Sequence, residues 1–278
     1  MGRRWGQHFL RSPTVLAAIV EAAALAPGEP VLEIGPGQGA LTERLLATGA
    51  RVTAIEVDPE LLAGLVARWA GEPRLRLIGG DIMRADLSPQ VLFDDLPPQD
   101  RAPYAVVANL PYYLSTPVLF RLMVHRATCS RLLLMVQREI AERLVALPED
   151  GKAYGALSVA AHHCFTMRRV LTVPPGAFRP PPKVDSAVVH FTPRPHQLPP
   201  AEEAAFLEHM KLLFTGRRKV MLGHMQRVYA QAPPAVWAAA APLVGRQRAE
   251  ALSPAQHLAV FRAMRAAGLP TAGKAAAG

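Results

Sequence analysis

Cysteine is scarce in this sequence, and metal-ligand patterns are missing. Only Cys129 and Cys164 occur among its 278 residues, and neither belongs to a CxxC pair. Two isolated cysteines exclude a disulfide-stabilised secreted scaffold, and no histidines stand at ligand spacing to complete a zinc site. We therefore expect a protein without a bound metal that works in a reducing compartment.

Targeting and membrane-spanning segments are absent as well. The first residues, MGRRWGQHFLRSP, lack the apolar core of a secretory signal, and no stretch approaches the roughly 20 apolar residues of a membrane span. No internal repeat is visible. These absences predict a cytoplasmic protein that does not enter a membrane.

Acidic residues are outnumbered. The chain has 31 Lys plus Arg against 22 Asp plus Glu, which gives a net charge of +9. Such an excess favours anionic partners, either nucleic acid or an acidic membrane surface. A basic soluble enzyme without such a partner remains an alternative on charge alone.

The first two thirds of the chain alternate between short apolar runs and helical patterns. After an expected helix at 14–25, strands are predicted by the apolar runs at 31–34, 52–57, 75–78, 104–108 and 131–136. This alternation indicates an α/β fold, a parallel sheet with helices on both faces and ligands at the carboxyl ends of its strands. Two later runs, 156–165 and 186–191, have no long helix between them and are expected to close the sheet as an antiparallel pair.

The amino-acid composition changes at the Pro-rich stretch that begins near Pro193. We expect a catalytic domain over 1–194 and a small helical domain over 195–278 that ends in a disordered tail. The region 196–278 carries ten Lys plus Arg and four Asp plus Glu, so the second domain is expected to be basic and suited to an anionic partner.

A Gly-rich turn, EIGPGQG, follows the first expected strand. Its glycines, at positions 35, 37 and 39, let a ligand approach backbone N–H groups at the start of the next helix. Glu56 lies 21 positions after Gly35, where nucleotide-binding α/β folds place a carboxylate on ribose hydroxyls. Asp81 follows the third strand and suits an adenine amino group, although a helix N-cap would explain it too.

The spacing of these glycines matters for the cofactor. A dinucleotide fingerprint is G-x-G-x-x-G, whereas this loop is G-x-G-x-G with Glu33 two positions before its first glycine. That variant resembles the loop of class I methyltransferases, which bind S-adenosylmethionine. A NAD-dependent oxidoreductase is disfavoured for the same reason.

The end of the fourth expected strand has unusual chemistry. It reads Asn109, Leu110, Pro111 and Tyr112. The side-chain oxygen of Asn109 and the carbonyl of Leu110 can each accept one N6–H of an adenine, which exposes the nitrogen lone pair to a methyl donor. Tyr112 offers a face for stacking of an extruded base, a contact worth about 1–3 kcal/mol. A turn-forming Asn and a core Tyr would be the purely structural explanation.

These motifs together resemble the KsgA family of small-subunit ribosomal RNA adenine dimethyltransferases, which is related to the Erm enzymes. The resemblance runs from about Gly6 to about Gln226, and its segments are GQHFL, EIGPGQGALT, IEVD, GDIM, NLPYYLSTPVL, VQREIAERL, YGALSV, VPPGAFRPPPKVDSAVV and LFTGRRK. It implies a class I Rossmann-like methyltransferase sheet with a small all-helical C-terminal domain. It also implies dimethylation of two adjacent adenines near the 3′ end of small-subunit RNA, with S-adenosylmethionine as donor and S-adenosylhomocysteine as product.

The resemblance assigns roles to individual residues. The expected cofactor contacts are Gln7, His8, Leu10, Gly35, Gly37, Glu56, Asp81 and Asn109. The expected catalytic and base-binding residues are Asn109, Leu110, Pro111, Tyr112 and Phe178, with Phe178 stacking opposite Tyr112. The expected RNA contacts are Lys183, Arg217, Arg218 and Lys219.

One position departs from the family pattern. The family usually has Asn where this chain has His8. An imidazole still donates a hydrogen bond, but histidine titrates near neutral pH, so we hypothesise that cofactor affinity depends on pH. A neutral substitution is the alternative.

The expected partners are small-subunit ribosomal RNA and the precursor of the 30S subunit, and the protein is expected to be a monomer. An Erm-like enzyme for large-subunit RNA and a DNA adenine methyltransferase share the chemistry and remain alternatives. A ribosome-assembly factor without catalysis is a third, which the intact Asn109–Tyr112 motif disfavours.

Overall fold

The computed structural model describes residues 7–101 and 103–270. The chain forms two compact units. The first comprises the described residues of Met1–Ala141 and Thr166–Pro193, and the second those of Glu142–Phe165 and Arg194–Gly278. The cofactor motifs all lie in the first unit.

A seven-stranded sheet is the centre of the first unit, with strand order β4-β3-β2-β5-β6-β9-β7. Its first five strands in the chain are parallel neighbours and confirm the expected positions. β9 then pairs antiparallel with β6 through Leu134 and Val189. The strands are β2 (Pro30–Ile34), β3 (Arg51–Glu56), β4 (Leu75–Gly79), β5 (Tyr104–Asn109), β6 (Cys129–Gln137), β7 (Phe165–Val173) and β9 (Ser186–Pro193).

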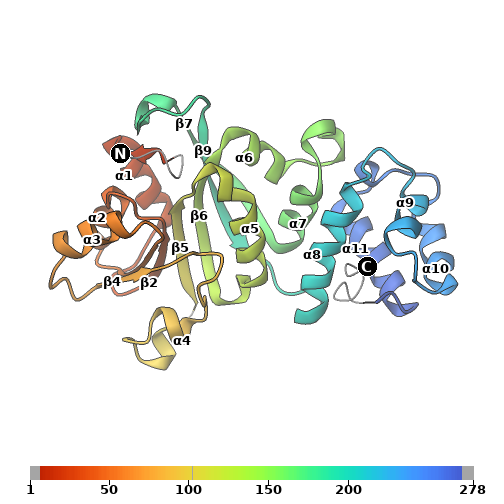
Figure 1. Cartoon of the computed structure of the whole chain (residues 1–278), viewed down its shortest axis with the longest axis horizontal. Helices are drawn as coiled ribbons and strands as arrows, with labels where there is room; N and C mark the ends of the chain where they lie inside the picture. Colours follow the sequence, from red (N-terminus) through yellow and green to blue (C-terminus); the bar gives the residue numbers. More distant parts are fainter. Residues whose placement is uncertain (1–6, 102, 271–278) are drawn as a thin grey trace. The chain divides into compact units, whose positions relative to one another are not determined.

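Helices connect the parallel strands. Figure 1 shows α1 and α2 on one face of the sheet and α5 on the other. Ser12 caps the first helix by accepting from the backbone N–H of Val15, and Pro13 occupies its first turn, where no N–H is needed. The helices are α1 (Pro13–Ala23), α2 (Ala40–Ala47), α3 (Pro59–Arg68), α4 (Pro89–Leu92), α5 (Ser115–Val124) and α6 (Arg138–Val145).

The core of this unit follows from the alternation of side chains along each strand. Val31, Val52, Val107 and Leu133 point to the same face and are at most 1% exposed, and they pack with Leu45 of α2 in one cluster. Burying a side chain of this size contributes about 1.5–3 kcal/mol. The cluster therefore fixes α1 and α2, and with them the Gly-rich turn before α2, on the sheet.

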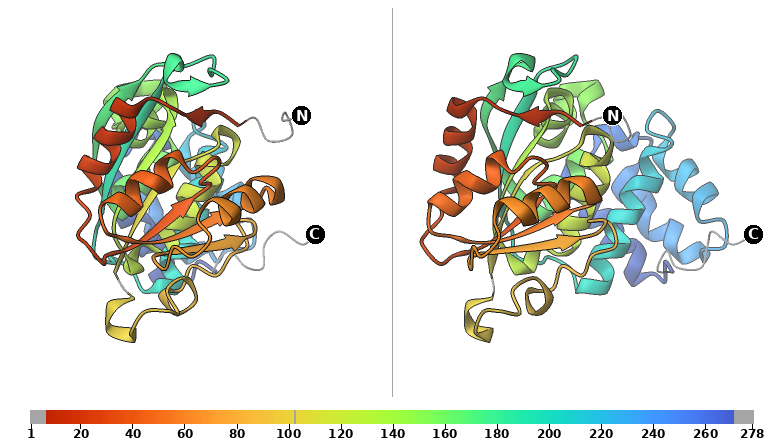
Figure 2. Two further views of the ribbon diagram at one scale, coloured as in Figure 1. Left: turned by 90° about the vertical axis from the view of Figure 1, so that its left-hand side faces the viewer. Right: turned by 60° about the vertical axis from the view of Figure 1, so that its left-hand side comes forward.

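A second, two-stranded sheet joins distant parts of the chain. β1 (Phe9–Leu10) pairs antiparallel with β8 (Phe178–Arg179), so that Leu10 lies opposite Phe178. Figure 2 shows the red strand β1 against the green segment that carries β8. The GQHFL and FRPPP motifs are thus held side by side, a pairing that the sequence did not predict.

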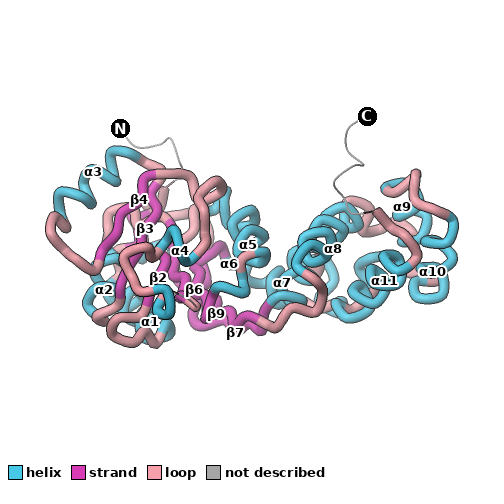
Figure 3. Tube along the Cα trace, turned by 90° about the horizontal axis from the view of Figure 1, so that it is seen from below, coloured by secondary structure: helices cyan, strands magenta, loops and turns pink. Residues whose placement is uncertain are grey.

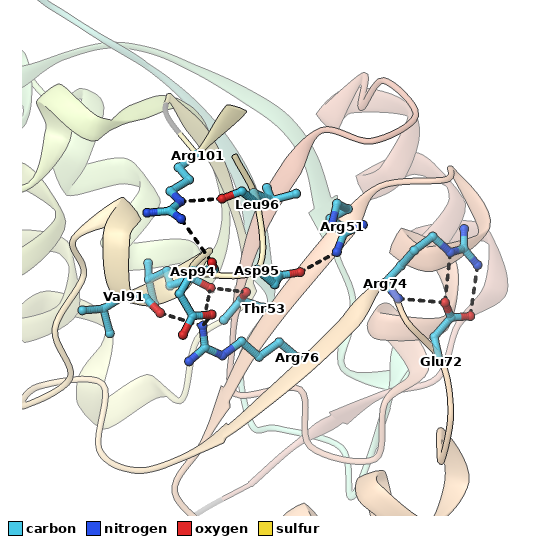
Figure 4. A network of polar contacts seen from close by, with 11 residues as sticks. Arg51, Thr53, Glu72, Arg74, Arg76, Val91, Asp94, Asp95, Leu96 and Arg101 are labelled. Carbon is cyan, nitrogen blue, oxygen red and sulfur yellow. Dashed lines mark hydrogen bonds and ion pairs between the residues drawn. The ribbon is translucent and has the colours of Figure 1, made fainter. Parts of the chain in front are cut away.

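Arginines hold the segment after α4 against the strands (Figure 4). Arg51 of β3 pairs with Asp95, and Arg76 of β4 pairs with Asp94. Arg101 donates to the carbonyl oxygens of Leu96 at 2.7 Å and of Asp94 at 3.1 Å. These contacts fix residues 91–101 near the amino ends of the strands, away from the candidate site.

The second unit is helical, and Figure 3 shows α8–α11 joined by loops. Its core contains Tyr154, Phe206, Met210 and Phe261, all fully buried. The hydroxyl of Tyr154 donates to the carbonyl of Leu252 at 2.7 Å. Its helices are α7 (Ala156–Cys164), α8 (Pro200–Phe214), α9 (Met221–Val228), α10 (Pro234–Val244) and α11 (Pro254–Ala266).

The structure corrects one predicted strand. Residues 156–164 form helix α7, and the strand at the edge of the sheet is β7 (Phe165–Val173). Seven of the nine residues of α7 are buried, so the apolar run lacks a polar face that would have shown a helical period. The prediction of 186–191 as a strand is confirmed by β9.

The division into units also differs from the expected boundary at residue 194. The break near Pro193 is present, but Glu142–Phe165 belongs to the second unit. Tyr154 and Val159 of this segment pack in the second unit's core, which explains the difference. The tail from residue 271, expected to be disordered, lies outside the described residues.

The described residues include no cluster of side chains that could hold a metal ion. Cys129 and Cys164 are buried free thiols. No helix in the described part of the chain has the length and apolarity to cross a membrane.

Candidate functional site

A cavity of about 220 Å³ lies at the carboxyl ends of β2, β3 and β5. It brings together eleven residues predicted from the sequence, from five separate segments of the first unit. These are Gln7, His8, Leu10, Gly35, Gly37, Glu56, Asp81, Asn109, Leu110, Pro111 and Tyr112.

The floor of the cavity includes the Gly-rich turn. Gly37 has φ +58°, and a Cβ there would lie 3.1 Å from the ring of Phe9, which also lines the cavity. Gly39 has φ +79°, and its Cβ would lie 2.3 Å from Trp69. Both positions therefore require glycine, for the turn and for the close approach of an aromatic ring.

Glu56, at the end of β3, is 4% exposed and organises this turn. Its Oε2 accepts from the backbone N–H of Gly37 at 3.0 Å, and its Oε1 accepts from that of Asp58 at 3.0 Å. Asp58 itself does not line the cavity, because its carboxylate caps α3 by accepting from Glu60 and Leu61. The carboxylate suited to a ribose is therefore Glu56.

Glu33 on β2 also lines the cavity, and sequence reasoning did not select it as a site residue. It is 1% exposed, and within the described chain its Oε2 has no hydrogen-bond partner. Burial raises the pKa of Glu33 to about 8, an effect opposed by the Thr42 hydroxyl and increased by the nearby charge of Glu56. This buried carboxyl therefore holds its proton near neutral pH.

Asp81 caps a turn and also lines the cavity. Its Oδ1 accepts from the backbone N–H of Met83 at 2.9 Å and so caps the turn that follows β4. The residue also lines the cavity. Tyr113, 53% exposed, lines the same region, and its pKa is raised by burial and by the charges of Asp81 and Glu56.

The charges around the cavity decide which cofactor fits. Its lining holds the carboxyl groups of Glu56 and Asp81, beside the protonated carboxyl of Glu33, and no Lys or Arg is among the described residues that line it. A pyrophosphate would meet no cation here, whereas a cationic sulfonium or ammonium group would be stabilised. The carboxyl groups of the lining therefore fit a positively charged nucleoside such as S-adenosylmethionine.

Asn109 ends β5 with its amide held in one orientation. Its Nδ2 donates to the backbone carbonyl of His8 at 3.1 Å. Because that carbonyl can only accept, Oδ1 lies on the other side of the amide and remains an acceptor. The backbone N–H of Leu110 donates to Met135 at 3.1 Å and fixes the main chain at the strand end.

Tyr112 is anchored at both its ring and its hydroxyl. Its hydroxyl forms a hydrogen bond of 2.9 Å with the hydroxyl of Ser186 at the start of β9. The imidazole of His8 lies on its ring, with centroids 5.4 Å apart and planes inclined by 33°. Sequence reasoning missed Ser186, although it ends the KVDS segment of a motif that was singled out.

Phe178 does not line the cavity, contrary to its expected position opposite Tyr112. Its side chain is 1% exposed and packs in the core cluster with Leu10 and Val188. The pairing of β8 with β1 turns the ring inward, which its place beside prolines could not reveal. In this structure the ring that faces Tyr112 belongs to His8.

The expected RNA-binding residues divide into two kinds. Arg217 donates to Glu250 at 2.9 Å and to the carbonyls of Lys152 and Gly151 at 3.1 and 3.2 Å, so it packs the second unit together. Arg218 and Lys219 are exposed. Lys183 is also exposed and does not line the cavity.

Two further basic residues lie near this exposed pair. Val220 forms an isolated β-bridge with Arg248, which brings residues 218–219 close to the exposed Arg246 and Arg248. The bridge joins loops that are far apart in the sequence, so only the fold reveals this basic cluster.

Comparisons with known proteins point to one family. The sequence model of the family described as "Ribosomal RNA adenine dimethylase" matches residues 2–265. A protein named "Ribosomal RNA small subunit methyltransferase A" from Thermosynechococcus vestitus is 44% identical over 273 residues, 95% of this chain and 96% of that protein. A protein of the same name from a Synechococcus strain is 44% identical over 228 residues, 79% of this chain and 77% of that protein.

Two solved structures resemble most of the chain. A dimethyladenosine transferase from Plasmodium falciparum has a TM-score of 0.76 at 24% identity, over 95% of this chain and 100% of that one. The 23S rRNA methyltransferase ErmE has a TM-score of 0.63 at 30% identity, over 92% of this chain and 99% of that one. Both support a class I methyltransferase sheet with a helical C-terminal region.

Proposed function

Because the chain belongs to the ribosomal RNA adenine dimethylase family and is an S-adenosylmethionine-dependent methyltransferase, we propose that it dimethylates N6 of two adjacent adenines of small-subunit ribosomal RNA. The target lies in the 3′-terminal hairpin of 16S RNA, in a precursor of the 30S subunit. The enzyme acts in the cytoplasm as a monomer. The observation that carries the proposal is one cavity that joins Glu56 and Asp81 to the Asn109–Tyr112 strand end.

The chain's own residues perform three tasks in this reaction. S-adenosylmethionine, when bound, supplies an electrophilic methyl group on a sulfonium. Glu56 and Asp81 orient its nucleoside, and the turn around Gly35 and Gly37 leaves room for its methionine part. Gln7, His8 and Leu10 close over it.

Asn109 and Leu110 act on the target nitrogen. Oδ1 of Asn109 and the carbonyl of Leu110 each accept one N6–H, which draws the nitrogen towards tetrahedral geometry and directs its lone pair at the methyl group. A new N–C bond forms as the S–C bond breaks, the electron pair stays on sulfur, and the surplus proton on nitrogen passes to solvent. Pro111 ends the strand so that the Leu110 carbonyl stays free of a ladder.

RNA contact is proposed for the exposed basic residues. Arg218 and Lys219, with Arg246 and Arg248 beside them, form a cationic cluster suited to a phosphate backbone. Lys183 is proposed as a further contact next to the base-binding segment. Arg217 is assigned to packing.

The large-subunit alternative is supported less. ErmE is 30% identical to this chain, against 44% for the relative named for the small subunit over nearly the same coverage. A non-catalytic assembly role is disfavoured because Asn109 retains its orientation.

The test uses purified 30S and 50S subunits from a strain that lacks this gene, labelled S-adenosylmethionine and the full-length protein. We expect label in the small subunit, a primer-extension stop at two adjacent adenines near its 3′ end, and no label in the large subunit. Label in the 50S subunit would favour the Erm-like alternative.

Asn109→Ala is the matched inactive variant. It should leave cofactor binding nearly intact in calorimetry but lose on the order of a hundredfold in turnover, as for removal of a group that acts in the transition state. Methylation within a few fold of the unmodified enzyme would remove Asn109 from the mechanism.

A further inference from the structure

His8 combines three contacts at the mouth of the cavity. Its ring lies 5.4 Å from that of Tyr112. Its Nδ1 donates to the carbonyl of Pro180 at 2.8 Å, and its own carbonyl accepts from Asn109. The side chain and the main chain therefore serve different neighbours.

This geometry raises the question of which ring opposes Tyr112 when a base enters. Phe178 is buried in the core and offers no exposed face. His8 is partly exposed, lines the cavity and already faces the Tyr112 ring. Among the described residues it is the ring paired with Tyr112 at stacking distance.

We propose that His8 is the second wall of the base-binding slot, so that the target adenine stacks between the imidazole of His8 and the phenol ring of Tyr112. The proposal rests on the proposed function and deepens it by naming a substrate-positioning residue. Two ring faces that hold a flat base between them need about 7 Å, twice a van der Waals contact. The ring centroids of His8 and Tyr112 are 5.4 Å apart, so admitting a base requires the rings to move apart by less than the thickness of one ring.

The anchors of the two rings differ in a way that suits such an opening. Tyr112 is fixed through Ser186, at the start of a buried strand. His8 is held through the carbonyl of Pro180, which is exposed and belongs to the loop after β8. The movable wall is therefore His8, and its hydrogen bond to Pro180 sets how far the ring swings.

The side chain and the main chain of His8 contact different residues, so the role of the imidazole can be tested by substitution. Replacing the imidazole leaves the His8 carbonyl in place, so the orientation of Asn109 is kept. His8→Ala and His8→Asn remove the ring, while His8→Phe keeps a ring and loses only the bond to Pro180. His125→Asn is the matched control, because His125 ends α5 and does not line the cavity.

The experiment measures methyl transfer to 30S subunits and, separately, binding of a hairpin RNA with two adjacent loop adenines by fluorescence anisotropy. For His8→Ala and His8→Asn we expect KM for RNA and Kd for the hairpin to rise about tenfold, the size of one lost base stack. Because His8 also closes over the cofactor, affinity for S-adenosylmethionine is measured separately by calorimetry and should fall by less than RNA affinity. His8→Phe should restore RNA affinity to within about threefold.

Other results would overturn the inference. A lower KM for RNA in His8→Ala would show that the imidazole blocks the base-binding position and must be displaced by RNA. Weaker cofactor binding with unchanged hairpin binding would assign the side chain to the cofactor alone. If the unmodified enzyme fails to methylate 30S subunits, the proposed function is wrong. The hairpin-binding assay does not depend on turnover, so it still tests the role of His8.

Discussion

The hydroxyl of Tyr112 lies 2.9 Å from the hydroxyl of Ser186 and joins the end of β5 to the start of β9. Two motifs 74 residues apart therefore meet through one hydrogen bond. Burial raises the pKa of Tyr112, so its hydroxyl keeps its proton and can donate. The ring of Tyr112 is thereby held in one orientation.

Loss of this bond should loosen the ring without removing it. Ser186→Ala is expected to lower kcat/KM about fivefold, since a buried neutral hydrogen bond contributes about 1 kcal/mol. Tyr112→Phe should have a similar effect, and the double variant should be no worse than either single one because both changes break the same contact. Fully additive losses in this double-mutant cycle would show that the two hydroxyls act independently.

Glu33 should make stability depend on pH. The native state keeps the Glu33 proton to about pH 8, whereas the unfolded chain releases it near 4.5. Stability contributed by this group is therefore complete below about 4.5 and is lost as the pH rises towards about 8, at up to about 1.4 kcal/mol per pH unit. Glu33→Gln should remove this part of the slope in urea unfolding measured across that range.

A control for Glu33 is available on the surface. Glu43→Gln makes the same chemical change at an exposed carboxylate paired with Arg68. It should leave the pH slope as in the unmodified protein. If Glu33→Gln and Glu43→Gln show equal slopes, Glu33 is ionised in the native state.

Three neighbouring basic residues should give two different phenotypes. Arg218→Ala with Lys219→Ala should weaken RNA binding and flatten its salt dependence, because each lost phosphate contact lowers the slope of log K against log salt by about 0.7–0.9. Arg217→Ala should lower the melting temperature instead, since it breaks the bonds to Glu250, Gly151 and Lys152. A salt slope that changes only in Arg217→Ala would reverse this assignment.

Buried histidines should make the second unit sensitive to acid. Burial lowers the pKa of His209 to about 3 and that of His257 to about 4, against 6.5 for a free side chain. Between these pH values the two histidines are protonated in the unfolded chain but neutral in the native state. The free energy of unfolding therefore falls as the pH drops from about 6.5 to about 4, by up to about 1.4 kcal/mol per pH unit for each histidine.

Urea unfolding between these pH values checks the effect. His209→Asn should reduce the slope of unfolding free energy against pH, even if it lowers stability overall. His196→Asn, at a partly exposed histidine, should change this slope little. If the free energy of unfolding falls as steeply with decreasing pH in His209→Asn as in the unmodified protein, His209 is not responsible for the effect.

The sequence predicted those features that local chemistry dictates. The parallel strands and the carboxylates at their ends follow from apolar runs that stop at polar residues, and eleven predicted residues meet in one cavity. The surroundings of Phe178 and Arg217 could not be predicted because they come from distant segments: β1 pairs with the strand of Phe178, and Glu250 forms an ion pair with Arg217. Helix α7 was taken for a strand because burial on most sides hid its period.

The interleaving of the two units has a consequence for synthesis on the ribosome. β6 ends at Gln137, but its antiparallel neighbour β9 begins at Ser186, after a segment that belongs to the other unit. A chain that emerges amino end first therefore leaves one edge of β6 unpaired while about fifty more residues are translated. The same delay applies to β1, whose partner β8 is made some 170 residues later, so the pairing that places Leu10 opposite Phe178 forms only after most of the chain has been translated.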